Sequence, residues 1–575
     1  MSLSASVRRA LTPATAPLAI EAAIRALVVS AVIATTGALL GNLQVVGVAY
    51  FGAGCAAGFA TGAVYRNRLA ALLAQGLGAV AGIAAGCLLP HSPAILIATA
   101  AVAGVISGVM GSMSPNAPAF GVMLSIGVAW GQFGQSALPW WQQCLWYLVG
   151  TAMIGVIALL PWLFRRGEVQ RLAAAEVFAR SADLCAAIGT DGARAARLRT
   201  AAASAAARQA GFFPAAELTA FAVAGFYAEG RTVGPAVITA IRAAADQTRR
   251  GEPLDVELAV PAQELAADPH LQALADALGP RPSRPGAPQS RRLAAAARTL
   301  IHPASLSTGL RVGLCLTVAT AIAVTLKRPG EHALWLPLTT AVVIRPEYGS
   351  VFVRTVNRVS GTVAGALVAA AVLWLQPPGL ALATAAAISL AGAVLTAPRL
   401  YAWYVTGITA SSLLSASLGH AALILPGVRV ADTLLGAAVA VVFGYLLWPG
   451  ARRLPSSARL TTALHAAHTY LTEAVKPPGL RAHWQIRRDD AYRLAHQVRA
   501  AAEVAVTEPP PVSAAAFAVV PLATRLEELV DSITALAHRT EAGIDCAASA
   551  TGVRDELARL HNDGRGLTDA VDHVV

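Results

Sequence analysis

The chain has 575 residues, of which 56% are hydrophobic and only 13% are charged, about half the charged fraction of ordinary soluble proteins. Its mean hydropathy is +0.57, and apolar runs of about 18–22 residues, long enough to cross a bilayer, recur along it. These values exclude a soluble protein and predict a polytopic membrane protein. The net charge of +12 lies mostly in loops and flanks, where it reports membrane topology rather than nucleic-acid binding.

The sequence shows neither a signal-peptide pattern nor a closely spaced pair of cysteines. Residues 1–17 lack a compact apolar core with a cleavage site, so we expect the first span itself to direct insertion. No two of the six cysteines form a C-x-x-C pair, and four of them lie in apolar runs, where a thiol acts as a small hydrophobe. We therefore expect no disulfide, no metal site and no cofactor. The cysteines are Cys55, Cys87, Cys144, Cys185, Cys315 and Cys546.

The apolar and charged stretches divide the chain into five predicted parts. The chain begins with a cytoplasmic segment (1–24), followed by a six-span repeat (25–164) and a helical cytoplasmic region (165–304) that contains a Pro/Gly/Ser-rich linker at 279–290. A second six-span repeat (305–450) and a helical cytoplasmic C-terminal region (451–575) complete it. The predicted spans are 25–40, 45–65, 69–89, 94–113, 119–135, 143–164, 308–326, 333–344, 356–375, 380–396, 401–418 and 430–448. The predicted fold class is all-α, with two transmembrane repeats that are each followed by helices in the cytoplasm.

A constant offset of 286 residues relates the two halves. It carries Arg25 to Arg311, Arg68 to Arg354 and Trp162 to Trp448, besides several glycines. Six spans in each half return the chain to its starting side, so the repeat is predicted to be parallel rather than inverted.

Lysine and arginine are distributed unequally between the loops. Loops on the amino-terminal side contain the arginines, whereas the opposite loops lack both residue types except at Lys327 and Arg328. The positive-inside rule therefore places both termini and both helical regions in the cytoplasm of an inner or plasma membrane. The inner-loop arginines are Arg66, Arg68, Arg165, Arg166, Arg345, Arg354, Arg399, Arg452 and Arg453.

The most informative stretch runs from Trp335 to Gly365, WLPLTTAVVIRPEYGSVFVRTVNRVSGTVAG. An apolar run passes into a group of four charges and then directly into a second apolar run. Pro346 ends a helix, and the pair Gly361 and Gly365 allows another helix to approach closely. Such a group of charges indicates either a cytoplasmic turn or a functional crevice. The charged residues are Arg345, Glu347, Arg354 and Arg358.

This stretch resembles the second-repeat motif of the fusaric acid resistance-like proteins, in the aromatic acid exporter superfamily. The R-x-x-D-T-x-x-G run from Arg429 to Gly436 is similar to the last span of that family, and the resemblance extends to the whole layout. The resemblance implies an inner-membrane exporter of organic or aromatic acids, or of related amphipathic toxic compounds, driven by the proton gradient. The first half departs from the motif, with Gln143 and Trp146 at the positions of Arg429 and Asp432. Functional asymmetry should therefore lie in the second half.

Six second-half residues are candidates for binding an organic anion. A guanidinium pairs with a carboxylate through two parallel hydrogen bonds, and hydroxyls can line a polar route. The alternatives are that the charges are inside-facing anchors and that the threonines form helix-to-helix hydrogen bonds. The candidates are Arg345, Glu347, Arg354, Arg358, Thr339 and Thr340.

Asp432 is the candidate for proton coupling, together with Arg429 and Arg311. A carboxylate inside a membrane span is a functional candidate by default. Asp432 lies three residues after Arg429 and therefore shares its helix face. The alternative is a structural ion pair with Arg429 or Arg311.

The sequence contains no phosphate-binding loop, no H-E-x-x-H and no G-x-S-x-G, and we expect no enzyme activity. The leading hypothesis is a secondary exporter whose partners are an organic-acid substrate and membrane lipids. An anion-conducting channel, which the same superfamily includes, is the second hypothesis, and a membrane scaffold without transport is the third. Apolar stripes on the charged helices can pack within one chain or between copies in a homo-oligomer.

Overall fold

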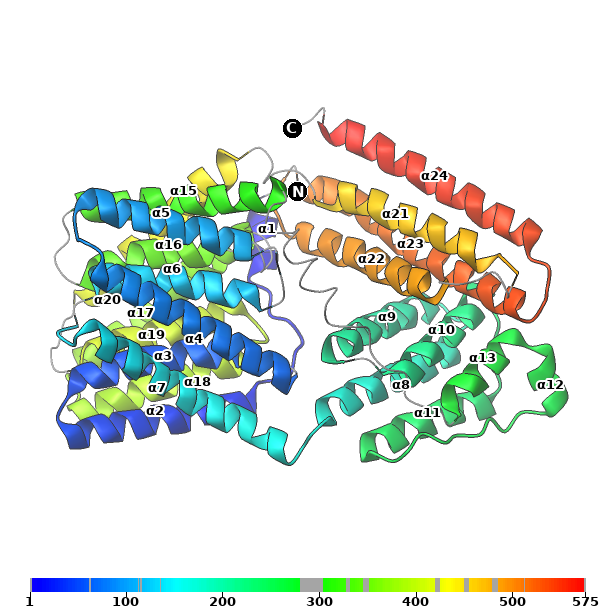
Figure 1. The fold of residues 1–575 in the computed structure, drawn as a ribbon, viewed down its shortest axis with the longest axis horizontal. Helices are drawn as coiled ribbons and strands as arrows, with labels where there is room; N and C mark the ends of the chain where they lie inside the picture. Colours follow the sequence, from blue (N-terminus) through cyan, green and yellow to red (C-terminus); the bar gives the residue numbers. More distant parts are fainter. Residues whose placement is uncertain are drawn as a thin grey trace. The chain divides into compact units, whose positions relative to one another are not determined.

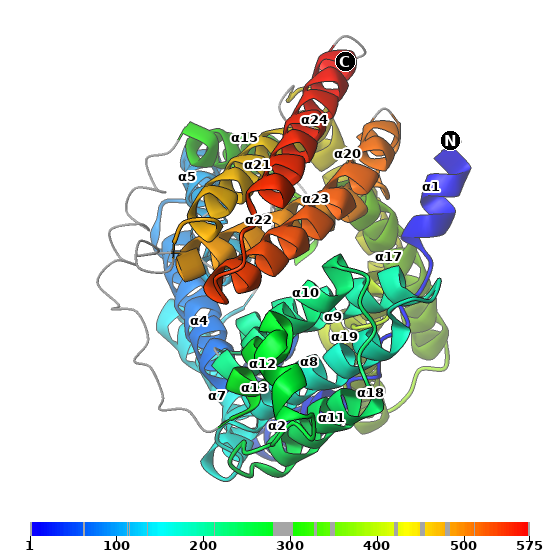
Figure 2. The same cartoon turned by 90° about the vertical axis from the view of Figure 1, so that its right-hand side faces the viewer.

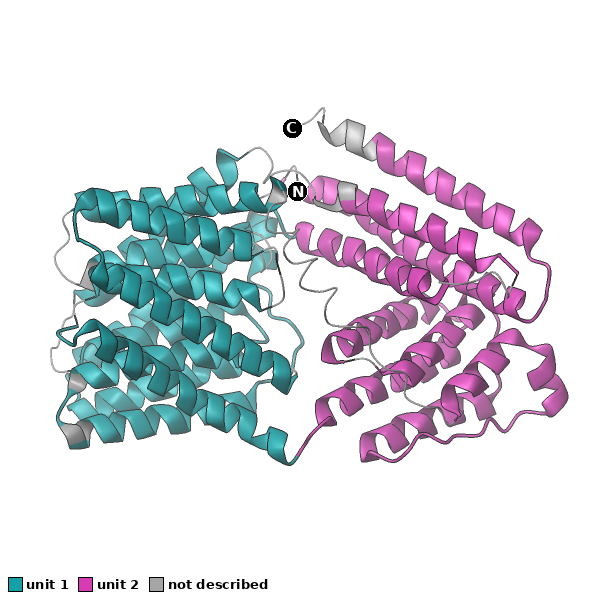
Figure 3. Cartoon of the chain, viewed as in Figure 1, with its two compact units in different colours: residues 1–164, 287–453, 507–509 teal, residues 165–286, 454–506, 510–575 magenta. Residues whose placement is uncertain are grey.

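The computed structural model is helical, without strands, over the residues that it describes. These are residues 3–60, 64–111, 113, 116–134, 136–211, 213–279, 303–326, 331–344, 351–418, 424–448, 455–477, 484–510 and 512–572. The chain forms two compact units, which Figure 3 colours separately. Unit 1 comprises residues 1–164, 287–453 and 507–509, and unit 2 comprises 165–286, 454–506 and 510–575.

Unit 1 contains two sets of apolar helices (Figure 1). The first set comprises α1 (Leu3–Ala10), α2 (Ile20–Leu40), α3 (Leu43–Phe59), α4 (Tyr65–Leu88), α5 (Pro93–Met110), α6 (Ala117–Phe133), α7 (Trp140–Leu159) and η1 (Leu160–Leu163). The second comprises α15 (Pro303–Thr325), η2 (Glu331–Leu334), α16 (Trp335–Val343), α17 (Val351–Trp374), α18 (Gly379–Thr396), α19 (Tyr401–Ala416), α20 (Leu425–Val441) and η3 (Val442–Leu446).

Eight helical segments in the described part of the chain are long and apolar enough to cross a membrane. The shorter apolar helices α3 and α6 lie between them in the sequence. This confirms the predicted all-α, multi-pass membrane protein. The long segments are 20–37, 65–88, 93–110, 140–163, 305–325, 351–374, 379–396 and 425–446.

Besides α3 and α6, two more of the predicted spans are short in the structure. The span expected at 333–344 is a 3₁₀ turn followed by α16, a helix of only nine residues. The span expected at 401–418 is α19, with 16 residues. At about 1.5 Å per residue, α16 alone covers less than half of a bilayer's hydrocarbon core. The count of twelve complete spans therefore stays a prediction.

The first long helix of each set packs against the other set. Helix α2 lies against α18, and α15 lies against α5. Within each set the pairings match, since α4 packs on α6 and α7 as α17 packs on α19 and α20. The two halves of unit 1 are therefore interleaved, and one apolar cluster draws its residues from both of them.

Glycines allow the closest of these contacts. A Cβ added at Gly82 of α4 would lie 2.3 Å from the carbonyl oxygen of Leu124 on α6. A Cβ at Gly104 of α5 would lie 2.7 Å from the Cα of Gly313 on α15. Backbone thus meets backbone at both interfaces, as in membrane helices that associate through small residues.

Unit 2 is built from the two charged stretches of the sequence. The first stretch supplies α8 (Glu168–Ala187), α9 (Ala193–Ala210), α10 (Pro214–Ala228), α11 (Pro235–Arg250), α12 (Ala262–Ala267) and α13 (Pro269–Leu278). The second supplies α21 (Pro455–Ala474), α22 (Trp484–Ala505), α23 (Val512–Glu541) and α24 (Ala547–Asp572). Apart from Gly279, the predicted linker at 279–290 lies outside the described residues.

The two stretches of unit 2 pack together within one chain. Helices α21 to α24 lie beside one another in Figures 1 and 2, and α23 also packs against α10 and α13. Fully buried aromatic residues occupy both apolar cores, Phe178 and Phe226 in one and Tyr470 in the other. The apolar stripes seen in the sequence therefore pack within the chain, with one core inside each stretch, and the two stretches meet where α23 lies against α10 and α13.

Candidate functional site

Four buried charged side chains lie on α17 and α20, two helices that pack together. Arg354 and Arg358 stand one turn apart on α17, and Arg429 and Asp432 share a face of α20. Arg429 is 2% exposed and Asp432 is 1% exposed. Burying a charged side chain is costly unless it is paired, so these residues form the candidate site.

Arg429 is in contact with several elements. Its guanidinium carbon lies 3.9 Å from the centre of the Trp335 ring on α16, a cation–π contact. It also interacts electrostatically with Arg358, Asp432 and Tyr401, the first residue of α19. Its Nε and Nη1 atoms make no hydrogen bond to any residue that the structure describes. These N–H groups have the chemistry to hold a carboxylate.

Asn357 fixes the part of α17 between the two arginines. Its side-chain nitrogen donates to the carbonyl oxygen of Ala10 at 2.9 Å, and its side-chain oxygen accepts from the backbone N–H of Ala402 at 2.9 Å. One buried amide thus connects α17 with α1 and α19. Sequence reasoning missed this residue, because an asparagine in an apolar helix does not reveal its partners.

The two candidate threonines of α16 are arranged differently. The hydroxyl of Thr340 can donate a hydrogen bond to the carbonyl oxygen of Leu336, at 3.1 Å, or to that of Gly436, at 3.2 Å. The second contact is the helix-to-helix hydrogen bond considered as an alternative to a polar route. Thr339 is buried against Gly436, and its hydroxyl has no hydrogen-bond partner among the described residues.

The remaining charged candidates are Arg345, Glu347 and Arg311. Arg345 and Glu347 fall outside the described residues. Arg311 is on α15, where its electrostatic neighbour is Cys315. The interactions of Arg429 include Asp432 but not Arg311. The structure therefore brings together Arg358, Arg429 and Asp432, without adding Arg311.

The corresponding positions of the first half are neutral. The residues 286 positions before Arg358, Arg429 and Asp432 are Leu72, Gln143 and Trp146. Gln143 accepts a hydrogen bond from Trp130 Nε1 at 3.2 Å and donates to the carbonyl oxygen of Leu138 at 2.9 Å. Hydrogen bonds between neutral groups thus occupy the first-half location, whereas the second half places charges there.

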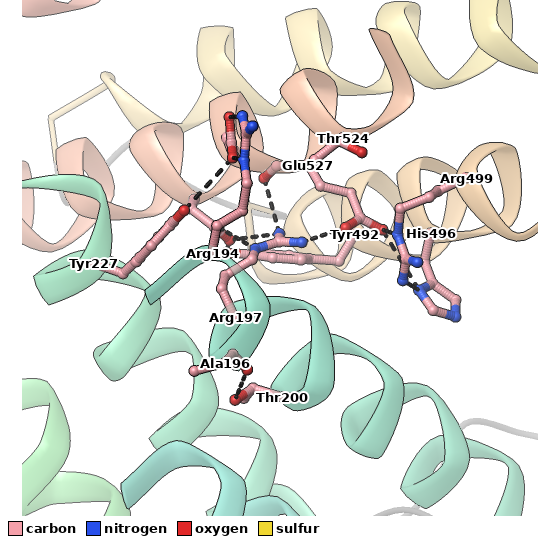
Figure 4. Close-up of polar contacts among 12 residues, drawn as sticks. Arg194, Ala196, Arg197, Thr200, Tyr227, Tyr492, His496, Arg499, Thr524 and Glu527 are labelled. Carbon is pink, nitrogen blue, oxygen red and sulfur yellow. Dashed lines mark hydrogen bonds and ion pairs between the residues drawn. The ribbon is translucent and has the colours of Figure 1, made fainter. Parts of the chain in front are cut away.

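A second buried polar cluster, which the sequence analysis missed, lies in unit 2 (Figure 4). Arg197 of α9 donates to Asp531 of α23 at 2.7 Å through Nε and also forms an ion pair with Glu527. Burial opposes ionisation of Glu527, but the hydrogen bond from His496 and the charges of Arg197 and Arg499 lower its pKa to about 2. Burial raises the pKa of Asp531 despite the nearby Arg197. The cluster therefore joins the two stretches of unit 2 by charge.

A small cavity lies beside this cluster. Its volume is about 40 Å³, which is room for about two or three water-sized molecules and far below the several hundred Å³ of a typical ligand pocket. The small volume of the cavity and the ion pairs within the cluster indicate a structural role. The polar lining residues are Arg197, Thr200, Ser204, Arg208, Tyr492 and His496.

Comparison with known proteins places a family match on the second half. Residues 314–443 match the model of the fusaric acid resistance protein-like family. This range contains the described charged group of α17 and α20. No solved structure matches the chain.

Two curated relatives are similar over shorter ranges. An uncharacterized protein YhfK of Escherichia coli (strain K12) is 28% identical over 197 residues, covering 33% of this chain and 27% of that protein. An uncharacterized protein ORF2 of Neisseria gonorrhoeae is 30% identical over 167 residues, covering 28% of this chain and 39% of that protein. The matches thus span less than half of either relative. The resemblance predicted from the Trp335–Gly365 motif is confirmed: the chain is a multi-pass membrane protein with a fusaric acid resistance protein-like region at residues 314–443.

Proposed function

We propose that the chain is a secondary exporter of organic or aromatic acids, or of related amphipathic toxic compounds, coupled to protons in an inner membrane. The observation that carries the proposal is the buried group of Arg358, Arg429 and Asp432, inside the region that matches the family model. The guanidinium groups supply donors for a substrate carboxylate, and Asp432 supplies a titratable group. Arg345 and Glu347 belong to the proposed substrate route because of the sequence motif.

The proposed transport unit is a pair of parallel six-helix repeats. Helices α4 and α17 begin at Tyr65 and Val351, and α5 and α18 begin at Pro93 and Gly379. Both intervals equal the 286-residue offset of the sequence matches. The similar helix pairings in the two halves also support a duplication. Because Arg358, Arg429 and Asp432 have neutral counterparts in the first half, we assign substrate and proton handling to the second repeat.

Transport in inverted vesicles tests this proposal. An acidic interior should drive uptake of labelled monocarboxylic aromatic acids chosen by a susceptibility panel in a knock-out host. A protonophore should abolish that uptake. An anion channel would instead give a current that follows the anion gradient and ignores the pH gradient. Absence of both signals, with a phenotype that depends only on the helical C-terminal region, would favour a scaffold.

The proposed topology places both termini and both helical regions in the cytoplasm, on the evidence of the arginine distribution. In a cysteine-free background, single cysteines replacing Asp191 and Asp555, which are exposed positions of unit 2, should not react with an impermeant maleimide in intact cells. Both should react after the cells are permeabilised. Reaction of both positions from outside would reverse the proposed topology.

Arg354 is expected to matter more for export than Arg68, its counterpart in the first half. Arg354 is buried on α17, whereas Arg68 is half-buried and its guanidinium lies 5.0 Å from the centre of the Tyr65 ring. At equal expression, Arg354→Ala should slow export by about 10- to 100-fold, the cost of one charge-assisted hydrogen bond. Arg68→Ala should change it far less. Equal defects would indicate that both arginines only anchor their helices.

A further inference from the structure

Two buried histidines meet between the two stretches of unit 2. His270 of α13 and His538 of α23 place their Nδ1 atoms 3.1 Å apart, although 268 residues separate them in the sequence. His270 is 0% exposed and His538 is 6% exposed. Gly225 of α10 makes room for the first ring, since a Cβ there would lie 2.5 Å from His270 Nδ1. The imidazole pair is thus a built feature of the interface between α13 and α23.

The charged groups around His270 balance one another. Glu229, at the end of α10, places Oε2 3.3 Å from His270 Nε2, and Arg539 of α23 lies 3.9 Å from the same carboxylate. Asp268, at the start of α13, accepts from the backbone N–H of His270 and pairs with Arg231, which follows α10. The two carboxylates and two guanidiniums have a net charge of zero. These four groups therefore supply no excess negative charge that would stabilise protonated histidines.

The geometry limits how many protons the pair can hold. A hydrogen bond between two Nδ1 atoms needs one N–H and one lone pair. The neutral pair meets this condition when His538 donates to His270, which puts the proton of His270 on Nε2, 3.3 Å from a carboxylate oxygen of Glu229. One added proton is also compatible with the contact, but two imidazolium rings would direct N–H groups at each other across 3.1 Å. Burial also lowers the pKa of His270 and so disfavours its protonation further.

We propose that the His270–His538 pair is a proton-operated joint that holds α13 against α23 at neutral pH and releases it in mild acid. An exposed histidine titrates near about pH 6.5. Because the closed joint binds protons less readily than the open one, it is most stable above that pH and weakens as the pH falls below it. Helix α13 is the last described helix before α15. The inference does not depend on the proposed export activity.

Hydrogen exchange on the full chain in detergent tests the joint. After correction for the intrinsic chemical rate, the amides of α13 in the wild type should exchange about tenfold faster at about pH 5.5 than at about pH 7.5, since one linked proton contributes up to about tenfold per pH unit. In His538→Asn, the introduced amide oxygen can accept from a protonated His270, so the pH dependence should disappear. His465→Asn, at an exposed position of α21, should behave as the wild type.

Two results would overturn the proposal. The first is wild-type exchange of α13 that does not change with pH. The second is wild-type pH dependence in His538→Asn. If that variant is unfolded at neutral pH, His538→Gln replaces it and the same two criteria apply.

Discussion

Replacing Asp432 with asparagine should abolish export driven by a pH gradient while substrate binding persists. Asparagine has nearly the same shape but cannot exchange a proton. Asp432 is buried on α20, in the electrostatic surroundings of Arg429. Uptake into inverted vesicles under an imposed gradient should fall to the level measured without a gradient. Substrate affinity should change by less than about threefold, which is under about 1 kcal/mol.

Two companion variants complete the Asp432 experiment. Glu21→Gln removes an exposed carboxylate from α2, 84% exposed at the side chain, and should transport normally. Glu347→Gln should mainly weaken substrate affinity, because the sequence assigns that residue to the substrate route. Normal gradient-driven transport by Asp432→Asn would eliminate Asp432 as the proton carrier and favour a structural ion pair with Arg429.

Arg197→Ala should be the most destabilising single change in unit 2. It would leave the carboxylates of Glu527 and Asp531 buried without the guanidinium that holds both. Removing one partner of a buried ion pair costs about 3–5 kcal/mol. In the detergent-solubilised full chain, amide exchange of α9 and α23 should rise by about two to four orders of magnitude.

Arg194 offers a matched control on the same helix. Its side chain is 64% exposed and pairs with Glu528, so Arg194→Ala should cost less than about 1 kcal/mol. Neutralising Arg197, Glu527 and Asp531 together should restore much of the stability, because no unpaired buried charge remains. Equal, small effects of Arg197→Ala and Arg194→Ala would contradict the proposed importance of the buried cluster.

The pH dependence of Glu527 follows from its lowered pKa. Its ordinary value is 4.5, and the folded protein lowers it to about 2. Glu527 therefore contributes its full stabilisation above about pH 4.5 and loses it as the pH falls toward 2. Ionisation of Asp531 has the opposite effect on the pH dependence of stability, because burial raises the pKa of this carboxyl group.

The membrane class and many helix positions could be predicted because both depend on local sequence. Apolar length identified the spans, and arginines, prolines and glycines marked their ends. The start of α20 was predicted at residue 430 and lies at Leu425, since the helix includes a polar turn around Arg429 that hydropathy alone excludes. The shortness of α16 was visible as a short apolar run. By contrast, the packing of α2 on α18 depends on contacts across the whole chain and left no periodic signal.

The candidate site was predictable as residue types but not as a geometry. The motif singled out Arg358, Arg429 and Asp432, whose charges stand out in apolar runs. It did not reveal that Trp335 lies under the Arg429 guanidinium, because tryptophans near span ends are common. The role of Arg197 could not be predicted for a similar reason. In an alanine-rich helix the sequence does not distinguish a buried arginine from an exposed one, and the partners of Arg197 lie far away in the sequence, on α23.

The construction of unit 2 from two distant stretches has a consequence for biosynthesis. The ribosome completes α9 long before α23, and Arg197 precedes Asp531 by 334 residues. At about 5–20 residues per second, Arg197 waits roughly 20–70 seconds for its partner carboxylates. The second membrane half must be inserted during this interval, while the α10 face that later meets α23 is uncovered. The half-made domain therefore resembles an unassembled subunit, and chaperone supply and translation speed should control how much of the protein reaches its folded state.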